Sequence, residues 1–226
     1  NGRNFCGVDS EIRLLRDLGC YADFTFPAWQ HTAQPRLTNA IFYAVDDPAR
    51  PKSHDRGERA RVGASALGDL LLIQGPLAPN VERRGRVPRV AMDDGDLAAS
   101  RRYGPERADR WVRAAIHVDG CGGRLFVKLH CHGAPERNAE CLLGGDLDRL
   151  FTDFETRYND GGRWRLHYVT AREMFNIVRA TEREPEMPVE EARDYLLKPP
   201  AKPVDLVADR FVQPVVAGGV PAAGRG

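Results

Sequence analysis

The pattern of hydrophobic and polar positions predicts an alternation of helices and strands along most of the chain. Apolar residues recur at helical spacing between Ser10 and Gly19, so a helix is predicted over residues 10–18. Runs rich in apolar, aromatic and β-branched residues, bounded by Gly, Pro or Asp, predict strands at 20–26, 40–45, 70–74, 125–132 and 166–169. Helical spacing returns at 106–118 and 146–158, and a Thr170–Glu173 capping box predicts a helix after it.

This alternation predicts the fold class. The Leu70–Ile73 run is continuously apolar, as expected for a strand that is covered on both faces. Strands of this kind that alternate with helices favour an α/β fold with a parallel sheet, either doubly wound or closed into a barrel. In both architectures the chemistry gathers at the C-terminal ends of the strands.

Two stretches and the C-terminal part show no clear helical or strand periodicity in their apolar residues. Residues 46–66 are polar and contain prolines, and residues 75–104 carry several arginines, so both are predicted to be loops. From residue 185 onward the chain is rich in proline and glycine. We therefore expect a folded domain over 1–184 and a Pro/Gly-rich extension over 185–226, with one short helix inside 189–197.

Composition and charge limit the classes of partner that we expect. The 226 residues include 33 Lys+Arg and 32 Asp+Glu, a net charge of +1, so no nucleic acid and no membrane surface is expected as a partner. No run approaches the ~18 apolar residues of a membrane helix. The five cysteines form no CxxC pair, which favours reduced thiols and a cytoplasmic location. No secretory signal is visible after Asn1.

The segment 125–132 carries the clearest chemistry. In a strand, Lys128, His130 and His132 share one face, and the other face is apolar. Polar groups on an inward face need partners, so a lined pocket is favoured over the solvated face of an edge strand. Histidines at i and i+2 can also bind a metal ion, although their spacing fixes no third ligand.

Three further residues are candidates for substrate binding. Asp23 alternates with phenylalanines in the first predicted strand and is a candidate buried carboxylate, or a partner for an amide or an arginine. Gln74 ends a strand, where it contacts substrate or braces a loop. His54 lies in a polar loop that folds over a site or is solvated.

Several enzyme classes are disfavoured by missing motifs. No Gly-x-Gly-x-x-Gly follows a predicted strand, and neither a Walker loop nor a Gly-x-Ser-x-Gly elbow occurs. Dinucleotide-dependent enzymes, P-loop enzymes and ordinary serine hydrolases are therefore not expected.

The order of three segments resembles a known family. Val127–His130, Tyr168–Met174 and Asp23–Ala28 are similar to motifs of polysaccharide deacetylase-like domains, from a bacterial branch of the glycoside hydrolase/deacetylase barrel superfamily. The resemblance covers about residues 10–182. It implies a parallel β/α barrel of the deacetylase type that lacks its first strands, because the strands that carry the family's metal ligands should precede residue 1.

The resemblance also implies a function. It points to deacetylation of an N-acetylated sugar or polysaccharide by a divalent metal such as zinc, with no metal ligand inside this chain. His130 matches the catalytic histidine, and Lys128 or His132 would bind substrate or hold its protonation state. Two alternatives remain open: a non-catalytic carbohydrate-binding or scaffold domain, and a glycosidase, which needs a second carboxylate beside Asp23.

Overall fold

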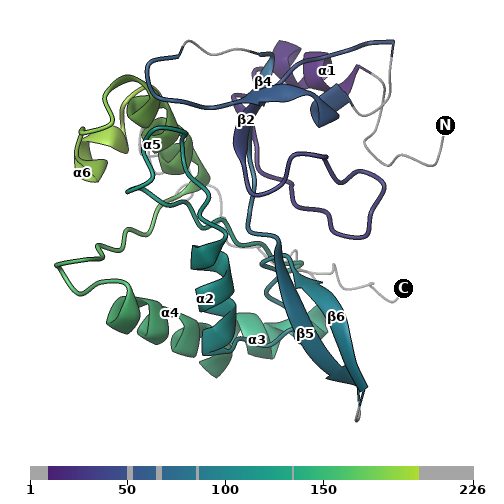
Figure 1. The fold of residues 1–226 in the computed structure, drawn as a ribbon. Coiled ribbons are helices and arrows are strands. Elements are labelled where there is room, and N and C mark those ends of the chain that lie inside the picture. The colour runs from purple at the N-terminus through teal and green to yellow at the C-terminus, as the bar shows by residue number, and fades with distance from the viewer. Residues whose placement is uncertain (1–9, 50–52, 65–67, 85–86, 134, 199–226) are drawn as a thin grey trace, which may run out of the picture.

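A computed structural model describes residues 10–49, 53–64, 68–84, 87–133 and 135–198. The chain forms a small mixed sheet with helices on both faces, and a separate two-stranded hairpin beside a second group of helices (Figure 1). The elements in chain order are α1 (Glu11–Asp17), β1 (Ala22–Asp23), β2 (Ile41–Ala44), η1 (Ser53–Asp55), β3 (Gly57–Arg59), β4 (Leu70–Ile73), β5 (Ala78–Arg84), β6 (Val87–Asp93), α2 (Pro105–Arg113), η2 (Glu136–Asn138), α3 (Ala139–Leu143), α4 (Gly145–Arg157), α5 (Ala171–Arg183) and α6 (Val189–Ala192).

The sheet has the strand order β1-β4-β2-β3. β1 runs parallel to β4, and β2 is antiparallel to both β4 and β3. Between β2 and β4 the described residues form only η1 and β3. An antiparallel neighbour needs no crossover helix, whereas a parallel neighbour does. The prediction of a parallel β/α barrel lacking its first strands is therefore wrong. The described residues form an α/β fold without a closed barrel.

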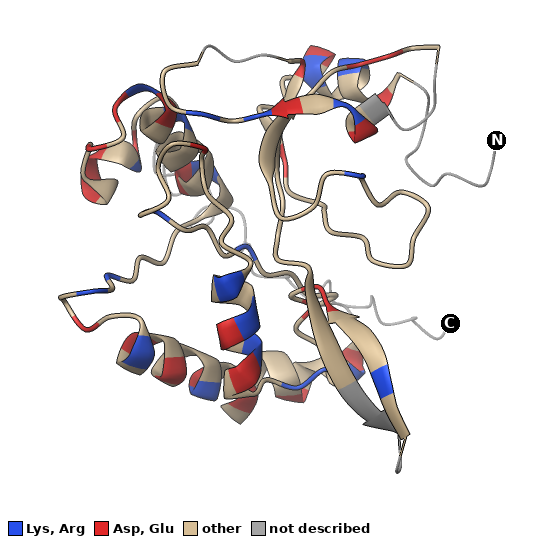
Figure 2. Ribbon diagram, viewed as in Figure 1, with Lys and Arg blue, Asp and Glu red and all other residues tan. Residues whose placement is uncertain are grey.

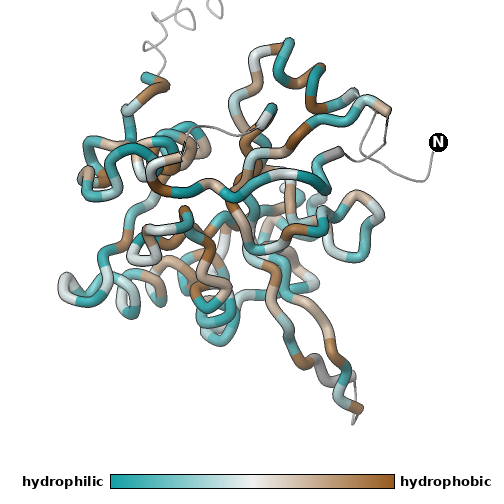
Figure 3. The backbone as a smooth tube through the Cα atoms, turned by 45° about the horizontal axis from the view of Figure 1, so that its top comes forward, coloured by the Kyte–Doolittle hydropathy of each residue, from teal (hydrophilic) through white to brown (hydrophobic). Residues whose placement is uncertain are grey.

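The sheet divides its apolar side chains between two cores, because successive residues of a strand point to opposite faces. In β2, Ile41 and Tyr43 pack into a cluster covered by α5, whereas Phe42 and Ala44 pack into a cluster covered by α1. The buried residues of β4 follow the same alternation. Figure 3 shows these strands as largely hydrophobic, with hydrophilic loops around them. The predicted doubly covered strand at 70–74 is thus confirmed.

A third core lies between α2 and α4, where Trp111 stacks on Phe154. Val127 and Leu129 pack against this cluster. α2 and α4 carry charged residues of both signs along their length (Figure 2).

Several predicted loops and strands need correction. The predicted loop 46–66 contains η1 and β3, and the predicted strand 20–26 is a strand only over β1. The stretch 75–104 is not all loop, because β5 and β6 form a hairpin that projects from the body (Figure 1). The segments 125–132 and 166–169 are extended but belong to no named strand. The first makes a single parallel bridge, between His130 and Asp96. Prolines inside the hairpin hid its alternation, and the segment 125–132 pairs with loop residues such as Gly95 and Leu97 instead of a strand.

The chain continues to pack beyond residue 184. Ala192 in α6 is fully buried, and Tyr195 and Leu197 lie against the core under α5. The part of the predicted extension after residue 198 lies outside the described residues. No described helix is long and apolar enough to cross a bilayer.

A buried polar cluster connects α5 to the sheet. The Glu182 carboxylate is 1% exposed and accepts hydrogen bonds from the Tyr43 hydroxyl at 2.8 Å and from Arg179 at 2.7 Å. Burial raises the pKa of Glu182 to about 7, against the opposing charges of Arg179 and Arg183. The folded protein therefore holds this proton more tightly than the unfolded chain does.

This proton predicts how stability depends on pH. Because the folded pKa of Glu182 lies above its unfolded value of 4.5, the wild type should lose stability as pH rises from about 4.5 to about 7. Between pH 5 and pH 7 the loss should be about 2 kcal/mol, and Glu182→Gln should remove most of it. Urea unfolding at pH 5 and pH 7 measures the difference. Glu184→Gln, an exposed position on the same helix end, is the matched control. Equal pH slopes for wild type and Glu182→Gln would contradict this account of the cluster.

Candidate metal centre

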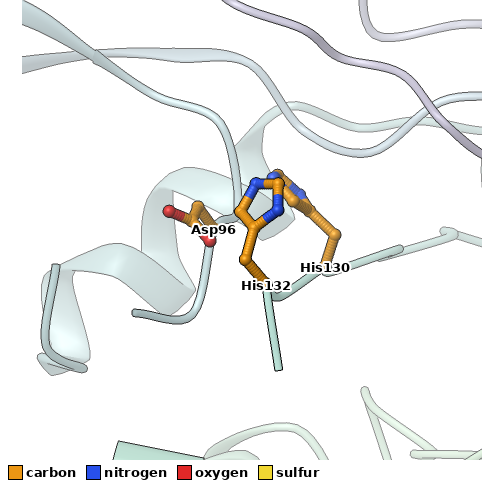
Figure 4. Close-up of side chains that lie close together, drawn as sticks. All are labelled: Asp96, His130 and His132. Atoms are coloured by element: carbon orange, nitrogen blue, oxygen red, sulfur yellow. The ribbon is translucent and has the colours of Figure 1, made fainter. Parts of the chain in front are cut away.

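Two chain segments meet at the bridge between Asp96 and His130. The His130 amide donates to the Gly95 carbonyl at 3.2 Å, and the Leu97 amide donates to the His130 carbonyl at 2.8 Å. The loop after β6 is thereby joined to the extended segment that carries both histidines. Figure 4 shows the Asp96 carboxylate beside the imidazole rings of His130 and His132.

Asp96, His130 and His132 form a group able to hold a metal ion. One ligand atom from each residue lies within 4.8 Å of the other two. Asp96 Oδ1 and His130 Nδ1 are buried and have no hydrogen-bond partner among the described residues. Buried polar atoms are normally paired, so these two atoms are suited to a ligand. His132 is exposed and keeps one side of the group accessible to solvent.

The electrostatic setting favours a neutral imidazole at His130. Burial lowers the pKa of His130, and the nearby charge of Lys128 lowers it further, while Asp96 and Asp94 act in the opposite direction. A histidine must be neutral to bind a metal ion through nitrogen. The lowered pKa therefore favours the metal-binding form of His130.

Lys128 places a buried cation on the same face of the segment. Its side chain is 9% exposed, and Nζ has no hydrogen-bond partner among the described residues. Burial lowers the pKa of Lys128 to about 8, although Asp23 and Asp94 raise it. The side chain lies against Gly75, where an added Cβ would sit 2.4 Å from the Lys128 carbonyl oxygen and 3.1 Å from Cε. A glycine at this position lets the two segments approach.

The loop that carries Asp96 is anchored by the buried carboxylate of Asp93. Arg107 donates to both Asp93 oxygens, at 2.9 and 3.0 Å, and Trp111 Nε1 donates at 3.0 Å. The Gly95 amide also donates to Asp93, at 3.1 Å. Gly95 has φ +75°, and an added Cβ would lie 3.3 Å from Leu129, so the turn requires glycine. Burial alone would raise the pKa of Asp93, but the hydrogen bonds from Arg107 and Trp111 lower it to about 2.

The structure brings together three of the residues predicted from sequence. His130 and His132 join the metal group, and Lys128 is their electrostatic neighbour. Asp23 acts on Lys128 through its charge, although its Oδ1 is already paired with the amide and hydroxyl of Thr25 at 2.7 Å. Asp23 also lines a groove of about 530 Å³ between α1 and the sheet.

Gln74 and His54, the other two predicted substrate-binding residues, make contacts with other parts of the chain. Gln74 is 1% exposed, accepts from the Ala40 amide at 3.1 Å and donates to the Leu37 carbonyl at 2.8 Å. These bonds brace the loop before β2, and a substrate contact would have to displace them. His54 stacks on Phe26 and contacts the Ala33 carbonyl at 2.9 Å, in the groove that Asp23 lines.

Sequence reasoning missed Asp96. It lies in the stretch 75–104, which was predicted to be a solvated basic loop, and its meeting with His130 is a contact across 34 positions. The local signal was the acidic turn Asp93-Asp94-Gly95-Asp96 at the end of an apolar run. The resemblance also pointed to metal ligands before residue 1, whereas this group lies inside the chain.

Comparison of this chain with protein-family models, with curated proteins and with solved structures finds no match. The chemistry of the site therefore has to be argued from its own residues.

Removing the Asp93 charge tests the anchor. Asp93→Asn should lower the free energy of unfolding at pH 7 by about 3 kcal/mol, because it leaves Arg107 buried without its counter-charge. The folded pKa of Asp93 lies below its usual value of 3.8, so the wild-type advantage should shrink as pH falls from about 4 towards 2. Urea unfolding at pH 7 and pH 3 measures both effects, with the exposed Asp148→Asn as control. A loss no larger than that of the control would show that Asp93 is not an anchor.

Proposed function

We propose that this chain is a metal-dependent hydrolase domain in which Asp96, His130 and His132 hold a divalent metal ion, and that its reaction is the deacetylation of an N-acetylated sugar or polysaccharide. The observation that carries the proposal is that Asp96, His130 and His132 each offer a ligand atom within 4.8 Å of the others, and that Asp96 Oδ1 and His130 Nδ1 are buried without a hydrogen-bond partner in the described part of the chain.

The donor set suits zinc. Two imidazole nitrogens and one carboxylate oxygen are ligands that zinc commonly takes, and catalytic zinc sites keep a fourth position open for water or substrate. The group supplies three ligands, and the exposure of His132 leaves an approach from solvent. A bound ion of this kind activates water and polarises a carbonyl group.

Each protein group then has a task. His130 is a half-buried ligand that fixes the position of the centre, and this role replaces the proton transfer that the family resemblance implies for it. His132 forms the solvent-side wall. Lys128 lies on the same face, where its ammonium group would attract the oxygen of a bound carbonyl.

The choice of an acetylated sugar has its own support, separate from the metal group. It is supported by the similarity of Val127–His130 and Tyr168–Met174 to the late motifs of polysaccharide deacetylase-like domains. A carbohydrate partner, with neither nucleic acid nor membrane, remains in keeping with the near-neutral charge.

The ligand variants test the metal centre. The full chain should bind one zinc ion, and Asp96→Ala, His130→Ala and His132→Ala should each reduce binding below detection in competition with a chromophoric chelator. His117→Ala should bind as the wild type does, because His117 lies outside the group. Zinc binding that survives all three ligand variants would place the metal elsewhere.

Turnover separates the catalytic proposal from its alternative. Acetate release from chitin oligomers should require zinc and should be lost in His130→Ala. If the wild type binds zinc and the oligomer but releases no acetate, the domain is a non-catalytic carbohydrate-binding module. If His130→Ala retains turnover, His130 has no part in the mechanism.

A further inference from the structure

The main-chain carbonyl of every residue in the metal group is held by a hydrogen bond. The Asp96 carbonyl accepts from Arg107 Nη2 at 2.8 Å, and the His132 carbonyl accepts from Asn138 Nδ2 at 2.8 Å. The His130 carbonyl accepts from the Leu97 amide at 2.8 Å. Two of these three donors are side chains that come from other elements, Arg107 from α2 and Asn138 from η2.

Arg107 is itself immobilised. Its side chain is buried, and its guanidinium forms two bonds with the Asp93 carboxylate and a further bond with the Arg101 carbonyl. The group therefore has one orientation, in which Nη2 reaches both Asp93 and the Asp96 carbonyl. A planar, delocalised guanidinium can make these bonds at once, whereas an ammonium group cannot match the geometry.

Asn138 joins the two segments that supply the ligands. It is 3% exposed and uses both ends of its amide: Nδ2 donates to the His132 carbonyl, and Oδ1 accepts from the Ala99 amide at 3.0 Å. Ala99 lies three residues after Asp96. One buried amide thereby sets the spacing between the Asp96 loop and the His132 end of the extended segment.

We propose that Arg107 and Asn138 are positioning residues of the metal centre, which fix the backbone of Asp96 and His132 so that their ligand atoms converge with that of His130. This inference rests on the proposed metal site. Partners outside the ligand set commonly control metal affinity because they orient the ligands before the ion arrives. The hydrogen bonds from Arg107 and Asn138 go to the main-chain carbonyls of Asp96 and His132, so we expect the two residues to act through the backbone.

A merely structural role makes a different prediction. If the two residues only stabilise the fold, their loss should lower the free energy of unfolding and leave the metal affinity of the folded protein unchanged. If they position ligands, affinity and coordination geometry should change in protein that is still folded.

The chain offers a matched control for Asn138. Asn176 in α5 is also fully buried and also bonds backbone groups through both ends of its amide, with Nδ2 donating to the Arg193 and Leu197 carbonyls and Oδ1 accepting from the Leu197 amide. These contacts lie in the core under α5, apart from the metal group. Asn176→Leu should therefore destabilise the protein as Asn138→Leu does without touching the Asp96 loop.

The test compares zinc affinity and the visible spectrum of the cobalt(II)-substituted protein for the full-length wild type and three variants, at a temperature where circular dichroism shows each to be folded. Asn138→Leu and Arg107→Lys should weaken zinc binding by about 10- to 100-fold and alter the cobalt absorption. Asn176→Leu should bind zinc and cobalt as the wild type does.

The outcomes distinguish a failure of the positioning role from a failure of the proposed metal site. A wild type that binds no zinc refutes the metal centre and the positioning role with it. A wild type that binds zinc, with Asn138→Leu and Arg107→Lys binding equally well, refutes the positioning role alone. If Asn138→Leu does not fold, the shorter but polar Asn138→Ser takes its place, and unchanged affinity in Asn138→Ser and Arg107→Lys is the refuting result.

Discussion

The buried Asp93 carboxylate is the interaction on which the rest of the site depends. It lies at the end of β6 and receives donors from Arg107 and Trp111 on α2 and from the Gly95 amide in its own loop. A carboxylate with this many hydrogen-bond donors can be buried, whereas an isolated charge in the same place would be strongly destabilising. Through this one group the hairpin, the helix and the turn before Asp96 become a single rigid unit.

A second constraint comes from the small sheet. Two strands, β2 and β4, are buried on both faces, so the helices that cover the sheet must supply apolar surface on either side. The metal group lies away from this layer, on extended segments that no strand ladder supports. Its geometry is therefore set by side-chain hydrogen bonds such as those of Asn138, and a few substitutions should alter the site without disrupting the sheet.

Sequence patterns predicted the parts of the fold that are set locally. The Leu70–Ile73 run is buried throughout, and the Thr170–Glu173 capping box starts α5 as expected. The prediction of a parallel barrel was wrong because strand direction depends on long-range pairing. The apolar runs of β2 and β4 are compatible with parallel and with antiparallel neighbours. Alternation along 125–132 grouped Lys128, His130 and His132. In the structure His130 and His132 converge, and Lys128 is an electrostatic neighbour of His130. Asp96 escaped detection because nothing in a sequence indicates which loop will lie against a distant histidine.

The central claim is that two imidazoles and one carboxylate bind a metal ion at this bridge. X-ray absorption spectroscopy of the full-length protein loaded with one equivalent of zinc tests it most directly. The account predicts a first shell of nitrogen and oxygen only, with the multiple-scattering signature of two imidazoles. A sulfur ligand, which would point to one of the chain's cysteines, or a shell without imidazole scattering, would contradict it.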